Sequence, residues 1–234
     1  MALPKLNHAT FELNVPGTGK KMKFRRTTFA EEKILLFAKE SRDENDFLAA
    51  MKQVVGICAQ DATFDENRVN IGAIEYLFLK IRAASINNIT TLTITDNEDK
   101  KQYPFTIDLN DVEIDDSKTT DGLIKLTDDI AIQLIYPPAS LYGDKTLNDE
   151  KDAYGELVVR CIDKIYDGES VIDPKTVKKD ELKQWLDQIE STTFDKIREF
   201  IGNQPTLHYE LKYTNANGKE KSVVLTKLSD FFTF

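Results

Sequence analysis

Apolar residues recur at helical spacing in three segments of the N-terminal half. Residues 28–41 open with Thr28-x-x-Glu31, a capping box that marks the start of a helix. Residues 46–60 and 71–86 continue the same periodicity, in which apolar side chains at i, i+3, i+4 and i+7 share one face. The three predicted apolar faces are Ala30, Ile34, Phe37 and Ala38; Phe47, Met51, Val54 and Cys58; and Ile71, Ile74, Phe78 and Ile81. We expect each face to pack into a core.

Other segments alternate apolar and polar residues around turn-forming residues, which is typical of β-hairpins. The predicted hairpins span residues 10–26, 90–109, 123–136 and 207–228. Their turns contain Pro16-Gly17 with Gly19, the polar run 96–100, Thr127-Asp128-Asp129, and Asn217-Gly218. These segments predict antiparallel pairing along the chain.

Helical spacing returns in the C-terminal half over residues 153–166, 181–189 and 193–203. The first of these predicts one face made of Tyr154, Val158, Cys161 and Ile165. In the second, Trp185 shares its spacing with Leu182, Leu186 and Ile189, so we expect this tryptophan to lie in a core. With the hairpins, these helices predict an α+β fold of short antiparallel sheets packed with helices.

The two halves resemble each other. "FLKIRAASINN" (78–88) matches "FDKIREFIGNQ" (194–204) at an offset of 116, and the hairpins that follow align without a gap at 119, pairing Leu92 with Leu211 and Leu109 with Leu228. A tandem duplication explains this, and so does chance agreement between helix–hairpin units. The division it predicts is a hairpin–helices–hairpin unit at 1–113, an acidic linker at 114–122 and a related unit at 123–234.

Composition narrows the class of protein. The chain has 234 residues, of which 41% are hydrophobic and 30% charged, with a net charge of −9 that disfavours general nucleic-acid binding. Cys58 and Cys161 lie in apolar stretches and form no metal-binding spacing, so each is expected to be buried and reduced. No apolar run approaches the roughly 20 residues of a membrane span, and residues 1–14 lack the apolar core of a signal peptide. We expect a protein made and used in a cytoplasm.

The sequence contains no convincing catalytic, cofactor or metal site. "NVPGTGKK" (14–21) imitates a phosphate-binding loop, but that loop requires Gly where Asn14 stands and Ser or Thr where Lys21 stands. The acidic run 110–122 lacks the register of a calcium-binding loop. Asp128 and Asp129 are adjacent and would point to opposite faces of a strand. Both histidines, His8 and His208, are expected at surface or edge positions. We therefore predict that the protein is not an enzyme and binds no cofactor.

One segment stands out as an interaction surface. Residues 1–30 are strongly basic, and the basic side chains gather at Lys20, Lys21, Lys23, Arg25 and Arg26. Charge asymmetry of this kind orients a protein on a partner. The alternative is a solvated hairpin face. The aromatic residues of "YPPASLYG" (136–143) are expected either to cap a core or to meet a partner.

"KFRRTTFAEEKILLFAKES" (23–41), followed by "EYLFLKIRAASINNI" (75–89), resembles the baseplate hub subunit family of T4-like contractile-tailed bacteriophages. The similarity is most specific over residues 20–90 and includes no catalytic signature. It implies a non-enzymatic role in the central hub of the tail baseplate, with other hub and tail proteins as partners. It also implies expression late in infection and assembly in the host cytoplasm. Both a virion component and a transient assembly chaperone fit this role.

Overall fold

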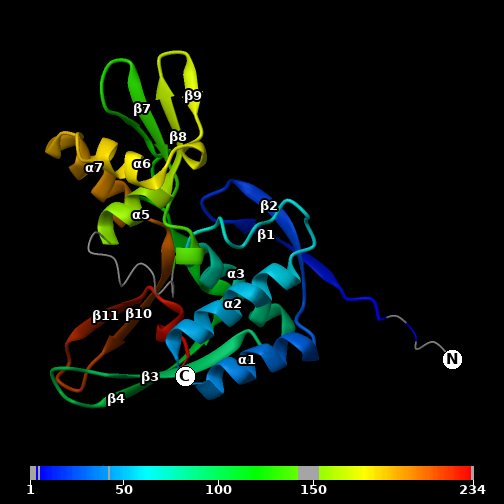
Figure 1. Ribbon diagram of the computed structural model, residues 1–234. Helices are drawn as coiled ribbons and strands as arrows, with labels where there is room; N and C mark the ends of the chain where they lie inside the picture. Colours follow the sequence, from blue (N-terminus) through cyan, green and yellow to red (C-terminus); the bar gives the residue numbers. More distant parts are fainter. Residues whose placement is uncertain (1–3, 5, 42, 142–152, 233–234) are drawn as a thin grey trace. The chain divides into compact units, whose positions relative to one another are not determined.

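The computed structural model describes residues 4, 6–41, 43–141 and 153–232, and its helices and short antiparallel sheets confirm the α+β class (Figure 1). The chain forms two compact units. Unit 1 draws its described residues from Met1–Glu66, Gly72–Asp115 and Thr206–Phe234, and unit 2 from Asn67–Ile71 and Asp116–Pro205.

This grouping differs from the predicted division at the C-terminus. The chain leaves unit 1 after Asp115, inside the acidic segment expected to be a linker, but it returns at Thr206. The return occurs because β10 (Thr206–Thr214) pairs with β5 (Glu113–Asp115), an antiparallel contact between segments far apart in sequence. Apolar periodicity cannot reveal which distant strands pair.

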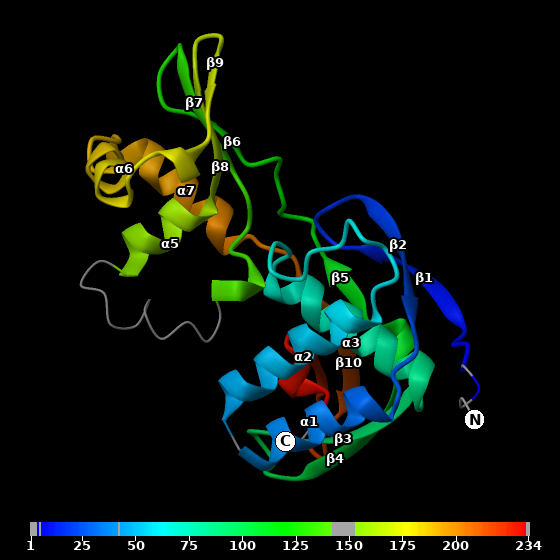
Figure 2. The same cartoon turned by 45° about the vertical axis from the view of Figure 1, so that its right-hand side comes forward.

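Three helices form the helical part of unit 1, each where the spacing predicts it. These are α1 (Phe29–Ser41), α2 (Glu44–Cys58) and α3 (Ile71–Ser85), which lie side by side (Figure 2). α3 is apolar on most of its circumference and is the most deeply buried of the three; its buried residues are Gly72, Ala73, Ile74, Leu77, Phe78, Leu79 and Ile81. Burial on several sides makes α3 the centre of the unit.

The predicted hairpins of unit 1 are all present. They pair β1 (Thr10–Val15) with β2 (Lys20–Arg25), β3 (Ile89–Thr95) with β4 (Gln102–Asp108), and β10 with β11 (Glu220–Leu225). Gly17, Gly19 and Gly218 have positive φ in the turns, as the turn residues predicted.

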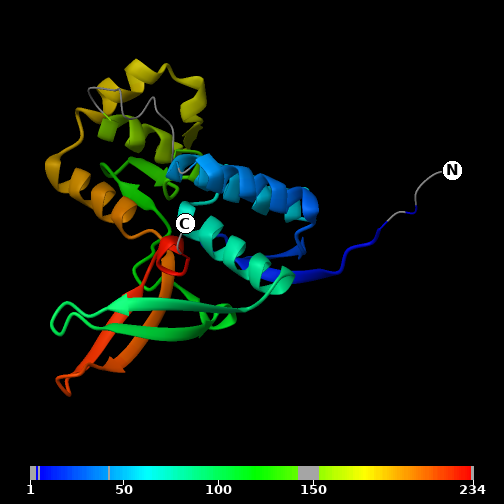
Figure 3. The ribbon, with the colours of Figure 1, turned by 90° about the horizontal axis from the view of Figure 1, so that it is seen from below.

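The second and third of these hairpins cross each other (Figure 3). The ring centroids of Tyr103 and Tyr213 are 4.8 Å apart, and the Tyr213 hydroxyl donates to an Asp96 carboxylate oxygen at 2.8 Å. The amide of Ala216 donates to the carboxylate of Asp99 at 2.8 Å. Strand and turn contacts therefore hold the two hairpins together.

The crossing hairpins share details at the offset of 119. Asp96 and Asn215 are both buried, and each accepts hydrogen bonds from backbone amides of its own turn. Leu109 and Leu228 are also buried, and they begin the 3-10 turns η1 (Leu109–Asp111) and η4 (Leu228–Asp230). The turns of the two hairpins differ in length, because the first hairpin has residues 96–101 between its paired ends and the second has only 215–219. Descent from a duplication stays a prediction.

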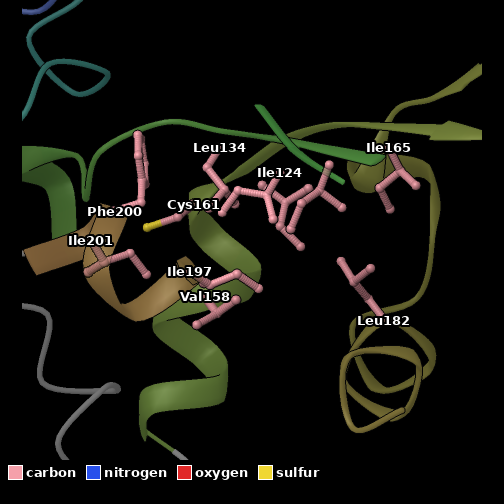
Figure 4. Packing of buried hydrophobic residues seen from close by; sticks show 11 residues of the cluster. Ile124, Leu134, Val158, Cys161, Ile165, Leu182, Ile197, Phe200 and Ile201 are labelled. Atoms are coloured by element: carbon pink, nitrogen blue, oxygen red, sulfur yellow. The ribbon is translucent and has the colours of Figure 1, made fainter. Parts of the chain in front are cut away.

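Unit 2 contains a four-stranded antiparallel sheet and three described helices. The strand order is β6 (Leu123–Lys125), β7 (Ile130–Leu134), β8 (Ile162–Asp167) and β9 (Ser170–Ile172). The helices are α5 (Ala153–Cys161), α6 (Lys179–Leu186) and α7 (Ser191–Gly202). Figure 4 shows their apolar side chains meeting the sheet, with Ile165 and Leu182 at one end of the cluster.

The helix predicted over residues 153–166 is wrong beyond Cys161. There the chain turns directly into β8, and Ile165, expected on a helical face, pairs with Ile132 of β7. The segment after Cys161 contains two isoleucines and a tyrosine, which favour a half-buried strand as strongly as an apolar helix face. Pairing with β7 decides between the two.

The core expectations for Trp185 and the two cysteines hold, whereas Tyr154, expected on the apolar face of its helix, is 37% exposed. Leu182 is buried, while Trp185, Leu186 and Ile189 pack against the same core. Cys58 and Cys161 are free and buried, and burial raises the pKa of their thiols to about 11 and about 12. Tyr136 stacks on Phe200 with ring centroids 4.3 Å apart, which assigns this aromatic of "YPPASLYG" to the core. Residues 142 and 143 of that segment lie outside the described residues.

Candidate partner-binding surface

The β1–β2 hairpin divides its side chains between two faces. Val15, Met22 and Phe24 are buried, and Phe24 packs edge-on against Phe64 with centroids 5.6 Å apart. Lys21 and Lys23 alternate onto the opposite, exposed face. The amide of Gln60 donates to the carbonyl of Lys23 at 2.8 Å, which fixes the hairpin to the segment that follows α2.

Most of the predicted basic cluster is accessible. Lys20, Lys21, Lys23 and Arg26 are exposed. Lys21 forms an ion pair with Glu12 at 3.0 Å, but both side chains are about half exposed, at 62% and 47%. An exposed pair of this kind is weak and can be exchanged for a partner's carboxylate at little cost.

Arg25 has a different role. Its guanidinium binds both carboxylate oxygens of Glu31, at 2.9 and 3.0 Å, and the Glu31 side chain is only 3% exposed. The hydrogen bond from Arg25 lowers the pKa of Glu31 to about 2, against the opposing effect of burial. The same carboxylate accepts from the amide of Thr28 at 2.7 Å, as the capping box predicts. Arg25 therefore joins the hairpin to the start of α1 and is not free for a partner.

The outward face of α1 is apolar. Phe29, Leu36 and Phe37 are 78%, 60% and 71% exposed. Together with Lys33 they recur at i, i+4, i+7 and i+8, which places them in one stripe along the helix. The Lys33 ammonium lies 5.2 Å from the centre of the Phe29 ring, so a positive charge sits against an aromatic face of the stripe.

The sequence prediction for α1 is wrong at Ala30 and Phe37, which are both exposed. Its expected apolar face paired Phe37 with Ala38, but Ala38 is buried while Phe37 points outward. The inner face is narrower because Glu31, held by Arg25, occupies part of it. The helix thus has apolar residues on two sides, and periodicity alone does not say which side meets the core.

The structure gives no support to other kinds of site within its described residues. Lys20 begins strand β2, so the strand–loop–helix arrangement of a phosphate-binding loop is not formed at 14–21. No group of three or more histidine, cysteine, aspartate or glutamate residues in this part of the chain is placed to hold a metal ion. None of the described helices is long and apolar enough to cross a membrane.

Comparison with known proteins identifies the chain's relatives. The model of a family described as "T4 bacteriophage base plate protein" matches residues 8–233. The chain belongs to this family. No curated protein and no solved structure gives a significant match. This member of the base plate family is thus a phage baseplate protein, and the family match covers nearly the whole chain.

Proposed function

We propose that this baseplate protein is a non-enzymatic component of the central hub and that it acts by binding other tail proteins. The observation that carries the proposal is the outward stripe of α1, whose three large apolar side chains are 60–78% exposed. Soluble proteins seldom leave such side chains together in water, and a patch of this kind marks an interaction site.

The exposed lysines before α1 complement the stripe. Lys20, Lys21 and Lys23 belong to β2, and only residues 26–28 separate this strand from α1. An apolar patch on a helix, with positive charge on the strand that leads into that helix, fits a partner surface with an apolar centre and an acidic rim, because rim charges steer association and apolar burial supplies affinity. The hub assignment itself rests on the resemblance of residues 20–90 to hub subunits.

A pull-down from infected cells tests the surface. Replacing Phe29 and Phe37 with Ser, or Lys20, Lys21 and Lys23 with Glu, should reduce recovery of baseplate proteins at least tenfold while leaving the circular dichroism spectrum unchanged. Arg25 is kept in both variants because its loss would disturb the fold. The matched controls are Leu123→Ser with Val224→Ser, and Glu at Lys118, Lys125 and Lys175, all exposed positions outside this surface. Unchanged recovery in both surface variants would refute the binding role.

Counting the protein in purified phage particles tests the hub role. A small fixed copy number per particle, measured by quantitative mass spectrometry beside the infected-cell lysate, is expected for a hub component. Presence in the lysate with absence from particles would replace this proposal with that of a transient assembly chaperone.

A further inference from the structure

Unit 2 contains an apolar cleft that the binding surface of unit 1 does not use. The cleft has a volume of about 230 Å³ and lies between the sheet and α6. Its apolar lining is Ile130, Ile165, Ile172, Val177, Leu182 and Trp185. Two acidic side chains, Asp167 and Glu181, complete it.

The sheet register explains this lining. Ile132, Ile165 and Ile172 are paired across β7, β8 and β9, and Asp167 lies two pairs along, opposite Ile130. Residues two apart on a strand share a face, so Asp167 points to the same side as Ile165. α6 supplies Glu181, Leu182 and Trp185 from facing positions one turn apart.

The cleft opens toward an uncovered edge of the sheet. β9 has β8 as its only strand neighbour among the described residues, and Ile172 on it is 36% exposed. Leu182, at 3%, lies at the bottom of the cleft. Apolar surface therefore continues from the buried core to an exposed edge strand, which is where short segments of other proteins commonly bind.

The charges around the cleft are acidic. The amide of Gly168 donates to the carbonyl of Asp129 at 2.9 Å, which brings the β8–β9 turn against the β6–β7 turn. These turns carry exposed Asp128, Asp129 and Glu169. Lys178 contacts Glu181 at 3.5 Å, but its side chain is 85% exposed and is easily displaced.

The nearby lysines of the sheet do not offset this charge. Lys125 pairs with Ala131 and Lys164 with Gln133, in the rows whose side chains alternate onto the other face. The face that lines the cleft thus presents carboxylates around an apolar floor.

We propose that this cleft binds a short segment of another protein, in which a large apolar side chain is flanked by lysine or arginine. The apolar side chain enters between Ile172 and Trp185, and its basic neighbours meet Asp167 and Glu181. This inference is independent of the hub assignment, because it concerns a second surface on the other unit and a ligand defined by its chemistry.

Trp185 provides a direct assay, since it is the chain's single tryptophan and it lines the cleft. The full-length protein is titrated with the synthetic peptide KKMKFRR, which has the sequence of residues 20–26 and serves as an extended basic probe with alternating apolar residues, while tryptophan emission is recorded. We expect a saturable change with a dissociation constant on the order of 10–100 µM, as befits a small pocket. The charge-reversed peptide EEMEFEE should produce no change.

Two variants separate the apolar and the charged contributions. Ile172→Gln should weaken binding about tenfold, and Asp167→Lys with Glu181→Lys should abolish it at low salt. Val224→Gln, on an edge strand of unit 1, and Glu40→Lys with Glu220→Lys are the matched controls and should bind as the natural protein does.

Three outcomes would overturn the proposal. The first is that adding the peptide does not change the emission of Trp185. The second is that Asp167→Lys with Glu181→Lys loses peptide binding but Ile172→Gln retains it. Binding would then be explained by electrostatic attraction to the acidic turns alone. The third is peptide-free emission that depends on protein concentration and accompanies dimer formation in sedimentation, which would make a second copy of this chain the occupant.

Discussion

The ion pair between Arg25 and Glu31 should stabilise unit 1 strongly, and replacing Glu31 with Gln tests this. The substitution keeps the shape of the side chain and removes its charge. It leaves the guanidinium of Arg25, whose side chain is only 15% exposed, without a counter-charge. Removing one partner of a buried pair is costly because the other charge stays desolvated.

The magnitude follows from the pKa of Glu31, which the protein lowers from 4.5 to about 2. Each pKa unit by which the folded and unfolded chains differ corresponds to 1.36 kcal/mol, so ionised Glu31 contributes about 3 kcal/mol to the free energy of unfolding. Because the folded pKa is the lower one, this contribution is complete above about pH 5. It is lost as the pH falls through about 2.

Urea unfolding between pH 7 and pH 2, followed by circular dichroism, measures this contribution as the difference between the natural protein and Glu31→Gln. Hydrogen exchange of peptides from α1 locates the loss in unit 1. The control is Glu12→Gln, which removes the exposed partner of Lys21 and should leave the unfolding free energy unchanged within error. A Glu31→Gln difference below about 1 kcal/mol at pH 7, or one that does not shrink toward pH 2, would refute the reasoning.

Four further substitutions probe other parts of the fold. Gly122 has a φ of +74°, and a Cβ there would lie 2.5 Å from the carbonyl oxygen of Leu134, so Gly122→Ala should cost about 3 kcal/mol in urea unfolding followed by Trp185 emission. Gly168→Ala, with a φ of +57° and open space around it, should cost only about 1 kcal/mol. Burial alone would raise the pKa of Glu156, but hydrogen bonds from Lys179, Arg160 and Lys183 lower it. Glu156→Gln should therefore lower the free energy of unfolding by about 3 kcal/mol in the same Trp185 assay. This loss of stability should be smaller at pH 4 than at pH 7. Tyr213→Phe removes the hydroxyl that donates to Asp96. It should speed hydrogen exchange at the amide of Ala216 without changing exchange in α7. Equal exchange rates at Ala216 in the variant and the natural protein would show that the hydroxyl does not hold the hairpins together.

Local chemistry determined most of the elements and the turns between them. Apolar spacing located α1, α2, α3, α6 and α7, and the turn residues located the hairpins, because periodicity and backbone preference act over a few neighbouring residues. The basic side chains of β2 were also visible in the sequence as a candidate surface. The family resemblance was visible in the amino-acid sequence of residues 20–90, and the family match covers residues 8–233.

Tertiary contacts decided what the local patterns left open. Pairing with β7 made a strand of residues 162–167, although their spacing also suits a helix. The buried carboxylate of Glu31 took Arg25 out of the basic surface and left Phe37 facing outward. The pairing of β10 with β5 returned the last hairpin to unit 1. In each case the outcome depends on a partner far away in the chain or on which of two apolar faces is covered, and a periodic pattern carries neither kind of information.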